Sequence, residues 1–304
     1  MHTHPGQLFT SRYGAVNGPE DVERYAVFLR DETGIGNEPP IDLGAILRRF
    51  GIPSPKYVTL PGQQGLLLDP EKGLILIEES DRPSRQRFTE AHELLEMLFT
   101  ALPTRPDAHG RNVGNFSHWT KERLCDAGAA ELLMPKATFL PFVQQLGVSF
   151  DTARTLAEKY QVSLAASLIR MVSIAPGRHA VVSWRMKNKP SEIKNQVPKS
   201  QLTLIEISVP RSAPQKLRVD WSFAGTGMPF IPKGKSVPDN TLIYAAWRER
   251  RFVAGSEHLD LGTSGGVFSV ENQPFETEGE WRVLSLLHFP TDAVEVQTKI
   301  TRDM

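Results

Sequence analysis

The hydrophobic pattern of the chain changes character at Pro176-Gly177. Before this point apolar residues recur at helical spacing, as in PEDVERYAVFLRDE (19–32) and TKERLCDAGAAELLM (120–134). After it come alternating or β-branched runs, among them HAVVSW, LTLIEISV, KLRVDW, TLIYAAW, GVFSV and WRVLSLLHF. Helices and strands are therefore segregated along the sequence, which indicates an α+β protein with a separate β-rich region.

The first half also contains three short extended runs between its helical segments, namely YVTL, GLLLDP and LILIEES. We expect helices over 19–52, from Pro83 through the following apolar stretch, over 120–134 and through 136–176. The pattern predicts three regions: 1–140, a helical module over 141–176, and a β-rich domain over 177–304. The first residues, with His2 and His4, are expected to be frayed.

Composition restricts the function classes. Lys plus Arg and Asp plus Glu both number 35 in 304 residues, so no net charge draws the protein toward nucleic acid or anionic lipid. The chain has no run of about 18 apolar residues and no secretory leader pattern. Its single cysteine, Cys125, fits a reducing compartment and is expected to be a buried packing residue. We therefore expect a cytoplasmic protein without a membrane segment.

The stretch AHELLE (91–96) starts like the zinc-peptidase motif H-E-x-x-H but carries Glu at the second histidine position. His92 and Glu96 are one turn apart and share a helix face, and Glu93 lies about 100° round the helix, within reach of a metal-bound water. A third ligand must come from another element, and the second helix offers Glu122, with Asp126 on the same face. The alternative interpretation is an ordinary i,i+4 polar pair on an exposed helix.

The surroundings of this motif resemble the ImmA/IrrE family of metallopeptidases, the minigluzincins. RQRFTEAHELLEMLF (85–99) matches the family pattern RFT-x-AHE-x-x-H, except for the last histidine. ERLCDAGAAELLMP (122–135) matches the second pattern, in which E-x-x-x-N or E-x-x-x-D precedes small residues and LLMP. The small tetrad 127–130 would let the second helix pack closely on the first. The resemblance covers about 19–176 and implies a zincin-like peptidase domain in the first region.

The resemblance also implies roles for individual residues. His92 and Glu122 would be metal ligands, and Glu93 would be the catalytic general base. Asp126 would orient His92 through its other ring nitrogen, as metal-binding histidines usually require. Zinc would be the metal, with manganese as the second candidate.

Position 96 leaves three alternatives open. Glu96 can be the remaining ligand, and a second anionic ligand would then weaken the Lewis acidity of the metal and favour harder ions. His118, four residues before Glu122, can take its place. In the third alternative the site has lost its metal and is kept for its shape.

By the same resemblance, the function is that of an endopeptidase that cleaves a helix-turn-helix transcriptional repressor and relieves repression. One branch of the family ends in a GAF-like sensor fold, which is a candidate for 177–304. The rival hypothesis is a non-catalytic regulator that binds a repressor or a small ligand without hydrolysis. Direct DNA binding by the helical segment 146–175 is not expected, because its central part offers only Arg154, Lys159 and Arg170 as basic residues.

Overall fold

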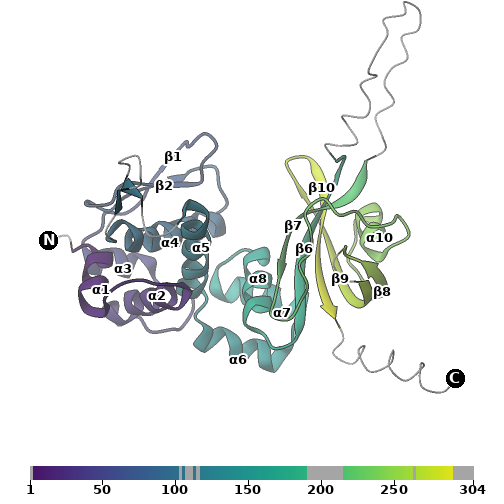
Figure 1. Cartoon of the computed structure of the whole chain (residues 1–304), viewed down its shortest axis with the longest axis horizontal. Helices are drawn as coiled ribbons and strands as arrows, with labels where there is room; N and C mark the ends of the chain where they lie inside the picture. The colour runs from purple at the N-terminus through teal and green to yellow at the C-terminus, as the bar shows by residue number, and fades with distance from the viewer. Residues whose placement is uncertain are drawn as a thin grey trace, which may run out of the picture. The chain divides into compact units, whose positions relative to one another are not determined.

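The computed structural model describes residues 3–102, 105–106, 112–113, 117–189, 215–262 and 265–289. The chain forms two compact units (Figure 1). The first comprises Met1–Gly147 with Asp151–Arg170, and the second Val148–Phe150 with Met171–Met304. Helices dominate the first unit and an antiparallel sheet forms the second, which confirms the predicted α+β class.

Eight helices lie in the first 174 residues of the described chain: α1 Pro5–Tyr13, α2 Pro19–Thr33, α3 Leu43–Phe50, α4 Pro83–Thr100, α5 His118–Leu133, α6 Lys136–Leu146, α7 Phe150–Tyr160 and α8 Leu164–Ile174. The helical predictions over this region are confirmed. Local signals set several ends. Asp42 caps α3 by accepting the N–H of Ala45 at 3.0 Å, and Gly34 ends α2 in the left-handed conformation.

Helix α1 shows that the expectation of a frayed start is wrong for His4. This side chain caps α1, since its Nδ1 accepts the N–H of Gln7 at 3.2 Å, and its Nε2 lies 3.3 Å from Thr100 Oγ1. Gly6 packs against α4 so closely that a Cβ there would lie 2.3 Å from the carbonyl oxygen of Met97. Contacts distant in sequence therefore fix this segment. His2 lies outside the described residues.

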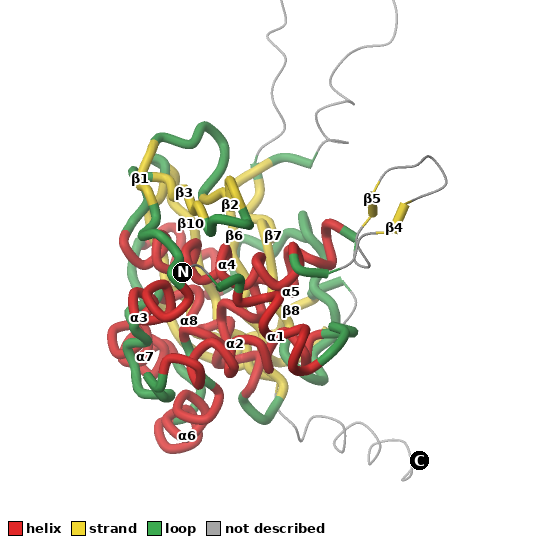
Figure 2. The backbone as a smooth tube through the Cα atoms, turned by 90° about the vertical axis from the view of Figure 1, so that its left-hand side faces the viewer, coloured by secondary structure: helices red, strands yellow, loops and turns green. Residues whose placement is uncertain are grey.

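A three-stranded sheet lies against α4 in the order β1-β3-β2 (Figure 2). Its strands are β1 Lys56–Val58, β2 Gly65–Asp69 and β3 Leu74–Glu78, as the extended runs predicted. β1 is parallel to β3 and β2 is antiparallel to it. Within the described residues β2 is thus an edge strand. A separate short pair joins β4 Arg105–Pro106 to β5 Asn112–Val113.

Helices α4 and α5 pack closely because the small residues of α5 face α4. A Cβ on Gly128 would lie 2.6 Å from Leu95 Cδ1 and 2.7 Å from Val22 Cγ1, so only glycine fits there. Cys125 is fully buried in the same helix, as expected of a packing residue.

We expect Gly128→Ala to lower the free energy of unfolding by about 1–3 kcal/mol, because the added methyl overpacks the contact between α5, α4 and α2. Urea unfolding followed by circular dichroism measures the change. Gly18→Ala is the matched control, since its backbone is extended and no heavy atom would lie within 4 Å of the new Cβ. Equal losses in the two variants would contradict the packing argument.

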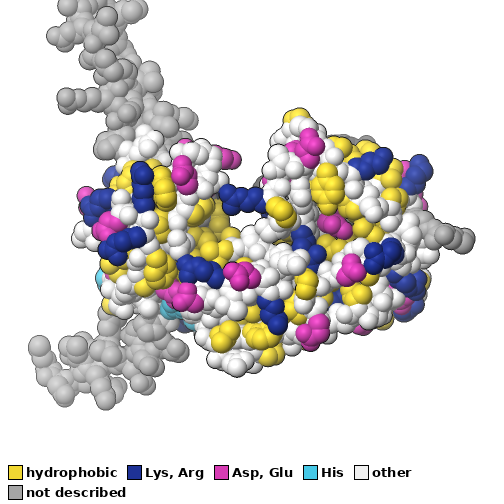
Figure 3. All heavy atoms as spheres, turned by 180° about the vertical axis from the view of Figure 1, so that it is seen from behind, with side chains coloured by type: hydrophobic (Ala, Val, Ile, Leu, Met, Phe, Trp, Pro, Cys, Tyr) yellow, Lys and Arg dark blue, Asp and Glu magenta, His cyan; other side chains and the backbone are white. Residues whose placement is uncertain are grey.

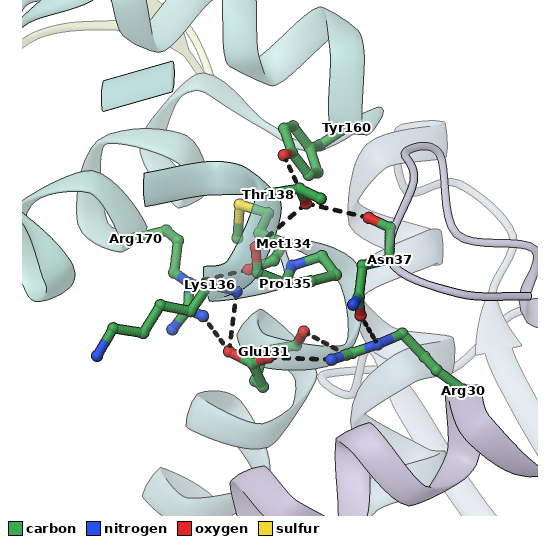
Figure 4. Close-up of polar contacts among 9 residues, drawn as sticks. All are labelled: Arg30, Asn37, Glu131, Met134, Pro135, Lys136, Thr138, Tyr160 and Arg170. Carbon is green, nitrogen blue, oxygen red and sulfur yellow. Dashed lines mark hydrogen bonds and ion pairs between the residues drawn. The ribbon is translucent and has the colours of Figure 1, made fainter. Parts of the chain in front are cut away.

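A buried polar network joins α2, α5, α6 and α8 (Figure 4). Glu131 on α5 lies at its centre. Its Oε1 is 3.1 Å from Arg30 Nη2, and its Oε2 pairs with Arg170. Both arginines also donate to backbone carbonyls, Arg30 to Glu131 at 2.8 Å and Arg170 to Met134 at 3.1 Å. The network fixes the C-terminal end of α5.

The second unit is built on a five-stranded antiparallel sheet in the order β7-β6-β10-β9-β8. The strands are β6 Arg178–Lys187, β7 Lys216–Ala224, β8 Val253–Asp260, β9 Gly265–Thr277 and β10 Glu280–Phe289. Trp184 on β6 donates to Ser285 Oγ at 2.9 Å, and Ser285 donates to Asn272 on β9 at 2.6 Å. This buried chain of hydrogen bonds crosses the three central strands. A GAF-like assignment of the sheet stays a prediction.

One predicted strand of this unit is wrong. The run TLIYAAW forms helix α10, Leu242–Glu249, because Thr241 caps it by accepting the N–H of Tyr244 at 3.2 Å. The fully buried Ile243 and Ala246 are three residues apart, which is helical spacing. The run LTLIEISV (202–209) lies outside the described residues. None of the helices in the described part of the chain is long and apolar enough to span a bilayer.

Candidate metal centre

Helices α4 and α5 bring together residues that are about thirty positions apart in sequence. His92 Nδ1 lies 3.0 Å from Asp126 Oδ1, and His92 Nε2 lies 3.4 Å from Glu122 Oε2. The imidazole is thus held between two carboxylates of α5. Burial alone would lower the pKa of His92, but the hydrogen bond to Asp126 and the nearby carboxylates raise it above its usual value.

The separation between His92 and Glu122 suits two ligands of one ion. Nitrogen and oxygen ligands at about 2.0–2.1 Å in tetrahedral geometry lie roughly 3.3 Å apart. In this arrangement Asp126 would fix the imidazole tautomer with a proton on Nδ1, which leaves the Nε2 lone pair for the metal. The two residues therefore fit a zinc or manganese ion.

Glu93 is the buried acid of the site. Its residue exposure is 5%, and Oε2 has no hydrogen-bond partner among the described residues. Burial, with a further contribution from the Glu96 carboxylate, raises the pKa of Glu93 to about 7. A carboxyl group with a pKa near neutrality and an unsatisfied oxygen is suited to accept and return a proton.

Strand β2 approaches this acid through residues that the sequence analysis did not single out. The backbone N–H of Leu67 hydrogen-bonds to the Glu93 carboxylate. A Cβ on Gly65 would lie 2.7 Å from Glu93 Oε1 and 2.3 Å from Thr89 Cγ2, so the glycine permits the strand to come this close. A glycine at the start of an otherwise apolar extended run was the only signal in the sequence.

Glu96 forms an ion pair with Lys121. Its Oε1 accepts a hydrogen bond from Lys121 Nζ, and both side chains are about one quarter exposed, at 23% for Glu96 and 25% for Lys121. Sequence analysis missed Lys121, although it directly precedes the candidate ligand Glu122. Among the described residues no three His, Cys, Asp or Glu side chains are grouped closely enough to hold a metal ion.

The remaining candidates can now be placed. His118 is the first residue of α5, but its side chain lies outside the described part of the structure. The separation of His92 and Glu122 fits a metal, whereas the Glu96 carboxylate is hydrogen-bonded to Lys121. The ligand set therefore stays a prediction.

Comparison with known proteins relates the segment that contains the site to a known peptidase domain. Residues 58–172 match the peptidase family model of the IrrE N-terminal-like domain. The chain is similar to the radiation response metalloprotease IrrE of Deinococcus radiodurans, with 31% identity over 122 residues, and to that of Deinococcus deserti, with 35% identity over 108 residues. These alignments cover 40% and 35% of this chain, and only 37% and 38% of the two relatives.

A solved structure supports the fold. A Mycobacterium tuberculosis transcriptional regulator superposes with a TM-score of 0.57 at 12% sequence identity, over 99% of this chain and 85% of that chain. At this identity the likeness concerns the fold alone. The matched region 58–172 contains α4, α5 and all five residues of the candidate site. Over this region the chain is therefore similar to the IrrE N-terminal-like domain and to the two IrrE metalloproteases.

Proposed function

We propose that this domain is a metal-dependent peptidase. The ligands would be His92, Glu122 and Glu96, the ion zinc or manganese, and the catalytic base Glu93. The observation that carries the proposal is the buried Glu93 carboxyl, whose Oε2 has no hydrogen-bond partner among the described residues. The preceding residue, His92, is separated from Glu122 by a distance that suits two ligands of one metal ion. A buried carboxyl with one unsatisfied oxygen costs stability, and such costs are typical of catalytic sites.

When bound, the metal would polarise the scissile carbonyl and acidify water. The side chains of the protein orient the ligand and transfer the proton. Asp126 holds the His92 ring through Nδ1. Glu93, with its pKa near 7, takes the proton of the attacking water on Oε2 and delivers it to the leaving amine.

Strand β2 offers a place for an extended substrate. In the described structure its only strand partner is β3, and the Leu67 N–H reaches Glu93. Leu66 and Leu68 are exposed at 37% and 57%. A peptide that adds to this edge strand would run past the catalytic base.

The substrate that we propose is a protein, specifically a helix-turn-helix transcriptional repressor, whose cleavage would relieve repression. The two Deinococcus relatives are named radiation response metalloproteases, and the structural relative is named a transcriptional regulator. The names of the two Deinococcus relatives support a protein substrate in a stress response, and a soluble repressor would place the reaction in the cytoplasm.

A non-catalytic regulator is the second candidate, and the ion pair between Lys121 and Glu96 favours it. This pair satisfies the charge of Glu96 without a metal. The domain would then bind a repressor or a small ligand along the same edge without cutting it.

The DNA-binding hypothesis gains no support from the helical segment. Arg170 is 6% exposed and pairs with Glu131, Arg154 pairs with Asp151 at 2.6 Å, and Lys159 lies 4.6 Å from the ring centre of Phe142. All three basic side chains are thus engaged within the protein. On the face seen in Figure 3, basic and acidic side chains are interspersed and form no basic stripe.

We expect untagged protein purified without chelator to contain about one zinc or manganese ion per chain, and His92→Ala to contain none, as measured by elemental analysis. We also expect the metal-loaded wild type to cut a helix-turn-helix repressor, with the cut located by mass spectrometry. His258→Ala is the control, because His258 is an exposed histidine of the second unit.

The two candidate functions differ in the outcome. Metal in the wild type, loss of metal in His92→Ala and a specific cut support the peptidase. Absence of metal and of cleavage in the wild type, even after zinc or manganese is added, would reject the peptidase in favour of the non-catalytic regulator.

A further inference from the structure

The contact between Lys121 and Glu96 joins the first turn of α5 to the middle of α4, beside the candidate ligands. Lys121 directly precedes Glu122, and its ammonium binds the Glu96 oxygen. Glu96 is one turn after His92, so its carboxylate is a candidate to complete a three-ligand set on these two helices.

The same carboxylate cannot serve both cations fully. An ammonium group hydrogen-bonded to Oε1 occupies one of the lone pairs of the carboxylate, and it brings a positive charge beside the place of a divalent ion. Both side chains are about three quarters buried, so water screens this repulsion less than it would at an exposed site.

The ion pair also explains how the site is stable without metal. Glu93, Glu96 and Glu122 gather three carboxyl groups, and the Glu96 charge already raises the pKa of Glu93. In the described structure Lys121 is the side chain that forms an ion pair with Glu96, and it thereby offsets part of this repulsion.

We propose that Lys121 competes with the metal ion for Glu96 and so sets the metal affinity of the site. This inference rests on the proposed metal-binding function. In the metal-free state Lys121 neutralises Glu96, and metal binding requires the ammonium to turn away. The site would then fill only at metal concentrations high enough to displace Lys121, which makes occupancy responsive to metal supply.

The test is a competition titration of the full chain with zinc and with manganese against a chromophoric chelator. Lys121→Met keeps the length of the side chain and removes the charge. We expect it to bind metal at least tenfold more tightly than the wild type. Lys72→Met is the matched control, because Lys72 forms an ion pair with an acid elsewhere in the same unit, Asp69, at 3.0 Å. It should leave the affinity unchanged.

A second readout separates competition from a general effect on folding. In chelator, Lys121→Met should melt at a lower temperature than the wild type, since Glu96 loses its ion pair with Lys121. Saturating metal should raise its melting temperature more than that of the wild type. In a Glu96→Ala background the effect of Lys121→Met on affinity should largely disappear. If Lys121→Met does not fold, Lys121→Gln serves in its place.

Two results would overturn the inference in different ways. Equal or weaker metal binding by Lys121→Met, with the wild type binding metal, would reject competition by Lys121 and leave the proposed peptidase standing. Absence of metal binding in the wild type, in Lys121→Met and in Glu96→His would reject both the inference and the proposed function.

Discussion

Glu131→Ala is expected to lower the free energy of unfolding of the first unit by about 3–5 kcal/mol, because it removes the carboxylate that forms ion pairs with two buried guanidinium groups. Arg30 and Arg170 are only 2% and 6% exposed, so water cannot replace the lost carboxylate. Burial lowers the pKa of Arg30, which shows that its charge already lies in an unfavourable environment. Urea unfolding followed by helical circular dichroism measures the loss.

Glu158→Ala is the control for this variant, since it removes an exposed glutamate from α7. It should change the free energy of unfolding by less than about 0.5 kcal/mol. A loss below about 1 kcal/mol in Glu131→Ala would mean that the network in Figure 4 contributes little net stability, as some buried ion pairs do.

Glu93→Gln is expected to abolish peptide cleavage, with a loss of about 10²–10⁴-fold or more, while metal content stays unchanged. The amide keeps the shape of the carboxyl and still accepts the Leu67 N–H, but it cannot take a proton from water. Elemental analysis beside a cleavage assay measures both properties. Loss of metal in Glu93→Gln would show that Glu93 is a ligand rather than the base.

The same variant is expected to stabilise the metal-free protein at high pH. Because the folded-state pKa of Glu93, about 7, is above the usual 4.5, folding favours the neutral carboxyl. Its stabilising contribution is complete below pH 4.5 and is lost as the pH rises through 7. At pH 8 the glutamine should therefore gain up to about 3 kcal/mol over the wild type, and the difference should vanish near pH 4.5. Thermal melting in chelator at the two pH values checks this.

The elements that carry the candidate site were predictable because their signals are local. The periodicity around AHELLE predicted α4, and the i,i+4 spacing placed Glu122 and Asp126 on the face of α5 that meets His92. The small tetrad correctly predicted close packing of the two helices, as the contacts at Gly128 show. The roles of these residues stay predictions.

Features that depend on tertiary contacts could not be predicted in this way. The pairing of Glu96 with Lys121 joins two helices. In the sequence, each of the two residues alone looks like an ordinary charged residue of a helix surface. The approach of Leu67 to Glu93 depends on the strand order. The run TLIYAAW was misassigned because its β-branched and aromatic content outweighed a single capping threonine.

The position of β2 at the edge of its sheet has a consequence for the behaviour of the protein at high concentration. An edge strand that contains two exposed leucines is the place where two copies of the chain would first pair edge to edge and aggregate. The Glu93 carboxylate already holds the Leu67 N–H, which removes one backbone donor from such a ladder. Asp69 and Lys72 add charges where the strand ends. The catalytic acid that we propose thus also protects the substrate edge from self-association.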